Sequence, residues 1–204
     1  MKRLDARARH SASVVLLVVL VLFLLAAWVA TVNGLEPLDR GTRSMIRDGR
    51  PLGLARPMWI LGFVASGYVL FPITVVCSVV LWRRRQHALA LWLPAIGVAT
   101  AVALAVTKWL IHKPRPTLRG YGFPSGHVFG ATVFVLVALY LLWRLEAPHR
   151  SQQLARVAGV AFVTGVGYSR IYVNAHWLSD VVGGLLAGVA FALMVVLALD
   201  ARAR

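Results

Sequence analysis

Long runs of uncharged apolar residues constrain this chain more than any other feature of its sequence. The first run, about residues 12–33, has no charged side chain and would span roughly 30 Å as a helix. It is too long for the core of a signal peptide, and no small-residue cleavage site follows it, so we expect a membrane helix there. Six spans are predicted in all: about 12–33, 58–82, 88–107, 128–143, 157–171 and 181–199.

The composition agrees with an integral membrane protein. Hydrophobic residues make up 59% of the 204 residues and charged residues only 14%, whereas a soluble domain is about half apolar and a quarter charged. We therefore expect an all-α, six-transmembrane-helix bundle that forms a single domain over residues 1–204. The net charge of +15 favours anionic lipid or phosphate partners over nucleic acid. Cys77 is the only cysteine, which excludes an intrachain disulfide.

Basic residues at the ends of the apolar runs predict the orientation of the chain. With six spans, four basic clusters share one side, which the positive-inside rule makes cytoplasmic: residues 2–9, 83–85, 144–156 and 202–204. Both termini would then be cytoplasmic, in a bacterial inner membrane. The loops at 34–57, 108–127 and 170–180 would face the periplasm or cell exterior. Because these outer loops carry almost as many basic residues, their cations need a second explanation.

Three short patterns on the outer side would bring histidines, a carboxylate and cations to one end of the bundle. They read KWLIHKPRP from Lys108, PSGH from Pro124 and SRIYVNAHWLSD from Ser169. Phosphoryl transfer needs cations and amide donors around the phosphate oxygens, a nucleophile, and an acid for the leaving oxygen. The three patterns contain all of these groups.

Each of these residues has a predicted role. His176 and Asp180 are four apart, so on a helix they would share one face, with the carboxylate holding one ring nitrogen protonated and the other free to attack. His127 is left as the general acid. Ser125 is expected to be the N-cap of a helix whose first amides, from Gly126 onward, could bind an anion. The predicted phosphate-binding cations are Lys108, Arg115 and Arg170.

The three patterns resemble the signature of the type 2 phosphatidic acid phosphatase family, which is related to bacterial acid phosphatases and vanadium haloperoxidases. That signature runs Lys-six-Arg-Pro, Pro-Ser-Gly-His and Ser-Arg-five-His-three-Asp, and residues 108–116, 124–127 and 169–180 match it at every position. The match spans about a third of the chain. The resemblance implies a phosphohistidine intermediate on His176, protonation of the leaving group by His127, and metal-independent hydrolysis of lipid phosphates.

We expect no metal ion and no other cofactor. The chain has only seven acidic residues, and Asp180 is the only one of them in the three patterns. A two-metal phosphatase would need several carboxylates there. His127, His176 and Asp180 could form a ligand set in principle, but the surrounding cations would repel a divalent ion.

Further expectations concern the remaining outer residues and the packing of the spans. Residues 35–56 have apolar positions at helical spacing, which predicts a short amphipathic helix at the membrane interface, either lining an entrance for lipid or resting on the bilayer. The pair Gly184 and Gly188 would let two helices approach closely. Five residues complete the expectations: His112, Lys113 and Arg119 would face the headgroups, and Pro72 and Pro94 would be the only breaks within the apolar runs.

The predicted activity is that of a membrane lipid phosphatase. Candidate substrates are polyprenyl diphosphates such as undecaprenyl diphosphate, phosphatidylglycerophosphate, phosphatidate and lipid A phosphates, with a diphosphate or phosphatidylglycerophosphate favoured. Two other classes stay open: a vanadate-dependent haloperoxidase that uses the same pocket, and a non-enzymatic anion or lipid transporter. A transporter would require charges at mid-membrane depth or broken helices, whereas the charges of the three patterns lie at the ends of the predicted helices.

Overall fold

Helices make up nearly all of the regular structure. The computed structural model describes residues 3–32, 34–49, 51–117 and 120–201. Within these ranges the only strand-like pairing is an isolated bridge between Pro114 and Tyr121, so the predicted all-α class is confirmed. The elements are α1 (Ala6–Thr31), α2 (Glu36–Asp48), η1 (Leu52–Leu54), α3 (Ala55–Val64), α4 (Gly67–Arg83), α5 (His87–Ile111), α6 (Gly126–Arg144), α7 (His149–Tyr172) and α8 (Leu178–Ala201).

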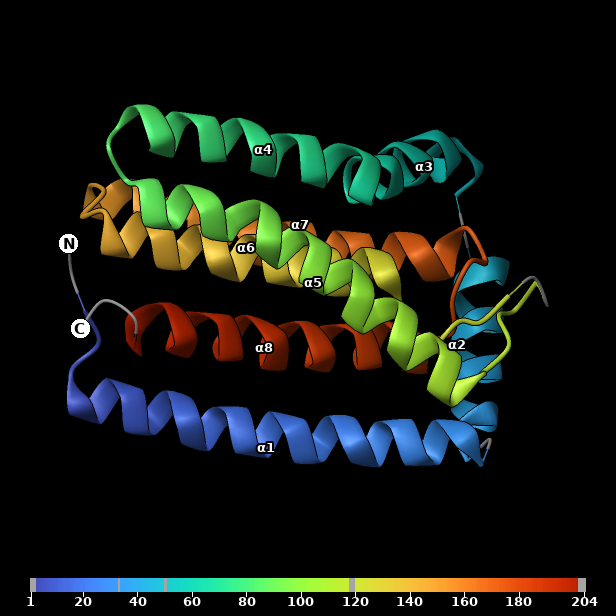
Figure 1. Cartoon of the computed structure of the whole chain (residues 1–204). Coiled ribbons are helices and arrows are strands. Elements are labelled where there is room, and N and C mark those ends of the chain that lie inside the picture. The colour runs from blue at the N-terminus through green and yellow to red at the C-terminus, as the bar shows by residue number, and fades with distance from the viewer. Residues whose placement is uncertain (1–2, 33, 50, 118–119, 202–204) are drawn as a thin grey trace.

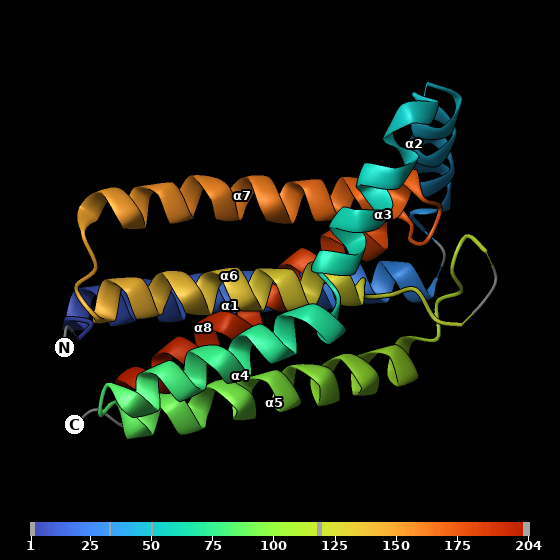
Figure 2. The ribbon, with the colours of Figure 1, turned by 90° about the horizontal axis from the view of Figure 1, so that it is seen from above.

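The long helices run side by side along a common direction, and α2 lies across one end of them (Figure 1). The same end holds the α5–α6 loop and the α7–α8 turn, whereas both termini and the α4–α5 turn lie at the other end. Figure 2 shows α7 on one side of α6 and the α4–α5 pair on the other. The three sequence patterns therefore meet at one end of the bundle, as predicted.

Four helices are long and apolar enough to cross a membrane, namely α1, α5, α6 and α8. Together, α3 and α4 qualify as a fifth span, bent by 43°. The predicted count of six is not reached within the described residues, because polar and charged side chains occupy both ends of α7, from His149 to Arg156 and again at Arg170. The protein is thus a multi-pass membrane protein with four or five clearly apolar spans.

The second predicted span, residues 58–82, consists of two helices. The break falls at Ala65 and Ser66, where Ser66 takes an extended backbone conformation before α4 begins. Pro72 and Pro94, which were expected to be the breaks, lie inside α4 and α5 and end neither helix. Prolines are tolerated in membrane helices because neighbouring groups satisfy the carbonyl that each one leaves free.

Small residues bring α6 and α8 together. A Cβ atom on Gly184 would lie 2.7 Å from the carbonyl oxygen of Ser125, and one on Gly188 would lie 2.6 Å from Cβ of Thr132. The predicted close approach at this glycine pair is therefore confirmed. Because the contact includes the residue just before α6, it fixes the beginning of α6 against α8.

The predicted helix of the first outer loop is α2. It is amphipathic, has Pro37 in its first turn and ends at Gly49. Asp39 on this helix is buried, with 2% of its surface exposed, and it accepts a hydrogen bond from the amide of Ser179 at 2.8 Å. Thus α2 is tied to the beginning of α8. The helix itself is confirmed, and its position at the membrane interface stays a prediction.

Candidate functional site

The α5–α6 loop brings the first two patterns to the beginning of α8. Helix α5 ends at His112, which adopts a left-handed conformation with φ of 53°, and Pro114 follows it. The loop then turns back, with the amide of Gly122 donating to the carbonyl of Lys113 at 2.7 Å. The amide of Ser125 donates to the carbonyl of Asp180 at 2.8 Å. That last bond joins the PSGH pattern directly to the third pattern.

His176 and Asp180 form the contact that their spacing predicted. Nδ1 of His176 lies 3.1 Å from Oδ2 of Asp180, and both side chains are buried. His176 does not share a helix with Asp180, however, because it lies in the α7–α8 turn while Asp180 lies in the first turn of α8. Oδ2 of Asp180 also accepts the amide of Trp177 at 3.1 Å, which caps the helix. The carboxylate thus fixes the helix start and the imidazole together.

The pKa of His176 lies below its ordinary value. Burial of the ring is the main cause, and the nearby positive charges of Arg115 and Lys108 act in the same direction. The hydrogen bond and negative charge of Asp180 oppose this shift but do not cancel it. At neutral pH the imidazole is therefore neutral. If Asp180 holds the proton on Nδ1, Nε2 keeps a free lone pair.

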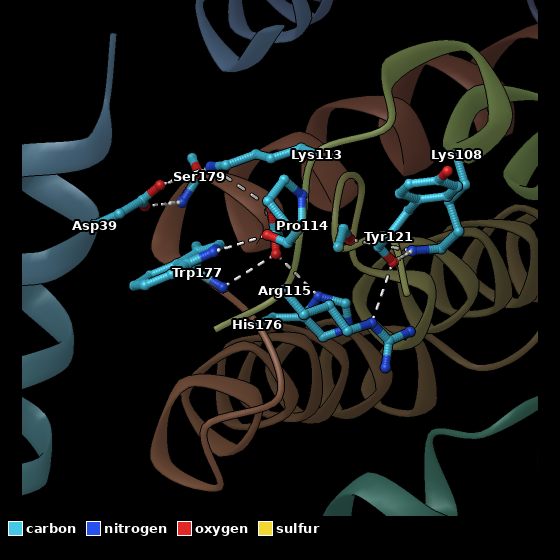
Figure 3. A network of polar contacts seen from close by, with 11 residues as sticks. Asp39, Lys108, Lys113, Pro114, Arg115, Tyr121, His176, Trp177 and Ser179 are labelled. Atoms are coloured by element: carbon cyan, nitrogen blue, oxygen red, sulfur yellow. Dashed lines mark hydrogen bonds and ion pairs between the residues drawn. The ribbon is translucent and has the colours of Figure 1, made fainter. Parts of the chain in front are cut away.

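Two of the predicted cations are held by carbonyl groups of the α5–α6 loop. Nζ of Lys108 donates to the carbonyls of Tyr121 at 2.9 Å and Gly122 at 3.1 Å. Nε of Arg115 donates to the same carbonyl of Tyr121 at 3.1 Å (Figure 3). No hydrogen bond joins the two terminal nitrogens of Arg115 to the part of the chain that the structure describes. The fork of this guanidinium is thus available to an anion.

The third cation, Arg170, is buried against α3. Its Nη2 donates to the carbonyl of Met58 at 3.3 Å, and its Nε donates to Oγ of Ser169 at 3.2 Å. The guanidinium lies over Gly62, where a Cβ atom would come within 1.6 Å of Nη2. Only glycine can occupy this position of α3 unless Arg170 moves. The arginine is therefore fixed by neighbours on two helices.

The beginning of α6 carries the remaining predicted residues. Ser125 occupies the N-cap position, as expected, but its hydroxyl makes no capping hydrogen bond. Oγ of Ser125 is buried without a partner among the described residues. Gly126 and His127 form the first turn, where backbone amides are not used by the helix itself. His127 lies near the positive charges of Arg170, Arg115 and Lys108.

A cleft of about 960 Å³ opens between α4, α5 and α6. Most of its wall is apolar and includes Leu70, Phe71, Leu93, Phe134 and Leu141. Five of the eight predicted site residues line the same cleft, namely Lys108, Arg115, Gly126, His127 and His176. A polar, cationic pocket is thus continuous with a long apolar one.

One part of the site was not predicted. Lys113, expected to face the headgroups, is buried, and its Nζ donates to Oδ2 of Asp39 at 2.7 Å and contacts Oγ of Ser179 (Figure 3). Asp39 is therefore a second acid close to the site, contrary to the expectation that Asp180 was the only one. The sequence gives little signal for this pair, since 74 residues separate its members. Arg119 lies outside the described residues. His112 is exposed, and its contact with the headgroups stays a prediction.

Across the described ranges, no group of three or more His, Cys, Asp or Glu side chains is placed to hold a metal ion. The groups that converge are instead imidazoles, cations and helix amides, which suit an anionic ligand.

Part of the sequence is similar to a known family. Residues 111–204 match the family described as the PAP2 superfamily. The chain is 25% identical over 131 residues to phosphatidylglycerophosphatase B of Bacillus subtilis, an alignment that covers 61% of this chain and 64% of that protein. It is 27% identical over 139 residues to an undecaprenyl-diphosphatase of Sulfolobus acidocaldarius, covering 59% of each. The chain thus spans less than two thirds of the length of these two relatives.

A solved structure shares the fold over nearly the whole chain. The crystal structure of a transmembrane PAP2-type phosphatidylglycerolphosphate phosphatase from Bacillus subtilis superposes with a TM-score of 0.84. The superposition covers 93% of this chain and 97% of that one, at 21% sequence identity. At this level of identity the likeness establishes the fold.

Proposed function

Because residues 111–204 match the PAP2 superfamily and the two predicted catalytic histidines, His127 and His176, line a lipid-sized cleft, we propose that the protein is a membrane lipid phosphatase. It would hydrolyse a terminal phosphate from a lipid phosphate or lipid diphosphate. The predicted site residues are its working parts: His176, His127 and Asp180 for catalysis, and Lys108, Arg115, Ser125, Gly126 and Arg170 for the phosphate.

The observation that carries this proposal is the composition of the cleft along its length. His176, His127, Lys108 and Arg115 lie at one end, and apolar side chains continue down α5 as far as Leu93. Fifteen residues separate Lys108 from Leu93, which is about 22 Å of helix at 1.5 Å per residue. Burial of a lipid tail against such a wall is favourable by about 0.8 kcal/mol per CH₂ group. A tail in the cleft would hold its phosphate against the cations.

In the proposed reaction, the phosphate oxygens bind the free fork of Arg115, with Lys108, Arg170 and the first amides of α6 around them. Nε2 of His176 attacks phosphorus while Asp180 holds the proton on Nδ1 and stabilises the charge that develops on the ring. His127 donates a proton to the leaving oxygen. In the second step, the now neutral His127 accepts a proton from a water molecule whose oxygen attacks the phosphohistidine, so that the P–N bond breaks and phosphate is released. Proton donation requires that His127 be protonated when substrate is bound, and the dianionic phosphate favours that state.

We propose that no divalent ion takes part. The cations at the site neutralise the transferring phosphoryl group, which is the work that metal ions do in two-metal phosphatases. The purified protein is expected to keep full activity in excess EDTA. Loss of activity that Mg²⁺ or Zn²⁺ restores would refute this.

The proposed substrates are a polyprenyl diphosphate such as undecaprenyl diphosphate, or phosphatidylglycerophosphate. The names of the relatives support both, since one is a phosphatidylglycerophosphatase and another an undecaprenyl-diphosphatase. Both lipids present a terminal phosphate on a long apolar tail. Phosphatidate and lipid A phosphates share that feature and belong in the same assay.

A phosphate-release assay with purified protein in detergent tests the proposal. We expect release from at least one of the four lipids, inhibition by vanadate, and much slower release from a water-soluble phosphate ester that has no tail. The variant His176→Asn is the control for contaminating phosphatases and should release nothing. Absence of release from every lipid would sink the proposal, and bromide oxidation in the presence of vanadate would favour a haloperoxidase.

A further inference from the structure

A buried lysine lies between two carboxylates beside His176. Nζ of Lys113 is 2.7 Å from Oδ2 of Asp39 and 3.8 Å from Oδ1 of Asp180. The side chains of Lys113, Asp39 and Asp180 are 8%, 3% and 0% exposed. These three residues come from three separate segments: α2, the α5–α6 loop and the first turn of α8. One cation thus faces two buried anions.

The second oxygen of Asp180 depends on that lysine. Oδ2 is occupied by His176 and by the amide of Trp177, whereas Oδ1 is buried with no hydrogen-bond partner in the described part of the chain. A buried carboxylate oxygen without a partner is costly unless an opposite charge is near. Lys113 supplies that charge at 3.8 Å. Its positive charge therefore offsets the negative charge of the carboxylate that holds the imidazole.

Asp39 holds both Lys113 and the backbone next to Asp180. Its Oδ1 accepts the amide of Ser179 at 2.8 Å, and its Oδ2 accepts the hydroxyl of Ser179 at 2.6 Å. Ser179 directly precedes Asp180 in the first turn of α8, so these bonds fix the backbone from which the catalytic carboxylate extends. Asp39 also takes the shorter of the two contacts with Lys113, which leaves Asp180 only part of the lysine's charge.

We propose that Lys113 and Asp39 are positioning residues for the His176–Asp180 pair, and that their ion pair sets how firmly Asp180 holds the imidazole. This inference rests on the proposed phosphatase function. Neither residue lines the cleft, so neither is expected to touch the substrate. Four other ionisable groups lie around His176 and Asp180 and stay unchanged in the variants below. They are Lys108 from α5, Arg115 from the α5–α6 loop, His127 from α6 and Arg170 from α7.

Two single variants should move the acidic limb of the plot of kcat/KM against pH in opposite directions. In Lys113→Met, a positive charge close to the His176–Asp180 pair is removed, so the imidazole of His176 takes up a proton at higher pH and the limb moves to higher pH. In Asp39→Asn, the charge of Lys113 falls on Asp180 alone, so the limb moves to lower pH. Each shift should be about one pH unit, the size expected for a charge within 4–6 Å. In both variants kcat should fall while KM for the lipid changes little.

Matched controls separate this role from general effects of charge and folding. Glu36→Gln removes one negative charge from the same helix, at an exposed position where Glu36 pairs with Arg40, and should leave the limb in place. The double variant carrying Lys113→Met and Asp39→Asn restores neutrality. Its limb should return towards that of the wild type, while kcat stays low because Ser179 has lost one of the two Asp39 oxygens that hold it.

The result that would overturn the inference is a limb that stays fixed, or moves in the same direction, in both single variants. If either variant fails to fold in detergent, Lys113→Arg decides. It keeps the charge and should keep the limb of the wild type, and a shifted limb in a folded Lys113→Arg protein would also overturn the inference. Wild-type protein that hydrolyses no lipid would instead refute the proposed function, so the two failures can be told apart.

Discussion

At the scale of single residues, Asp180 shows how one side chain can serve both fold and site. Its Oδ2 accepts the amide of Trp177, the residue just before α8, and contacts the imidazole of His176. Gly122 allows this arrangement, because a Cβ atom there would lie 2.4 Å from Oδ2. Capping of the helix and orientation of the ring therefore depend on the same oxygen. A change at Asp180 cannot remove one without disturbing the other.

The lowered pKa of His176 predicts the position of the acidic limb of kcat/KM. Protonated His176 has no lone pair for attack, so activity should be present above the lowered pKa and be lost as the pH falls through it. The limb should therefore lie below the ordinary imidazole value of about 6.5. Asp180→Asn removes the partner that raises this pKa, so the residual activity of that variant should show a still lower limb. A wild-type limb above 6.5, after correction for ionisation of the substrate, would contradict this account.

At the scale of elements, the sequence was informative where the signal is local. Apolar runs and capping residues predicted α1, α2, the beginning of α5 and the N-cap of α6, because each of these depends on neighbours within a few turns. The beginnings of helices that depend on groups distant in the sequence were harder to predict. His176 was expected on a helix with Asp180, yet α8 begins two residues after His176. There the carboxylate of Asp180 accepts the amide of Trp177, and that of Asp39 accepts the amide of Ser179. The ion pair of Lys113 and Asp39 links residues 74 apart and follows no periodicity.

The close contact of α6 and α8 predicts a strong effect at Gly184. In Gly184→Ala the new Cβ atom would lie 2.7 Å from a backbone oxygen, which cannot rotate away. Overpacking of this kind costs about 1–3 kcal/mol, and here it would also pull Ser125 from Asp180. We expect a lower thermal unfolding temperature in detergent together with a lower kcat. Gly130→Ala on α6 is the matched control, because its Cβ atom would meet nothing within 4 Å. Equal stability of the two variants would argue against this contact.

At the scale of the whole molecule, the two ends of the bundle differ in chemistry. One end gathers α2, the α5–α6 loop and the predicted site, and the other carries both termini and the Arg83–Arg85 cluster (Figure 1). We propose that α7 completes a sixth span, since it runs beside α6 in both views despite its polar ends. With six spans, the arginine-rich end would be cytoplasmic and the site would face the periplasm or cell exterior.

Cysteine labelling tests this orientation in a Cys77→Ser background. A cysteine placed at Thr117, in the α5–α6 loop, should react with a membrane-impermeant maleimide in intact spheroplasts. A cysteine at Ser151, near the beginning of α7, should react only after lysis. Both native side chains are exposed, so lack of labelling cannot be assigned to burial. The reverse pattern would place the site in the cytoplasm, and labelling of both positions in intact cells would mean that α7 does not cross.

The most direct test of the central claim is to trap the phosphorylated enzyme. Purified protein turning over a lipid with a radiolabelled terminal phosphate would be quenched rapidly without acid, because phosphohistidine is acid-labile, and the labelled peptide would be sequenced. Label is expected on His176 and should be absent from His176→Asn. Label on Ser125, or turnover with no labelled residue under conditions that preserve phosphohistidine, would contradict the central claim.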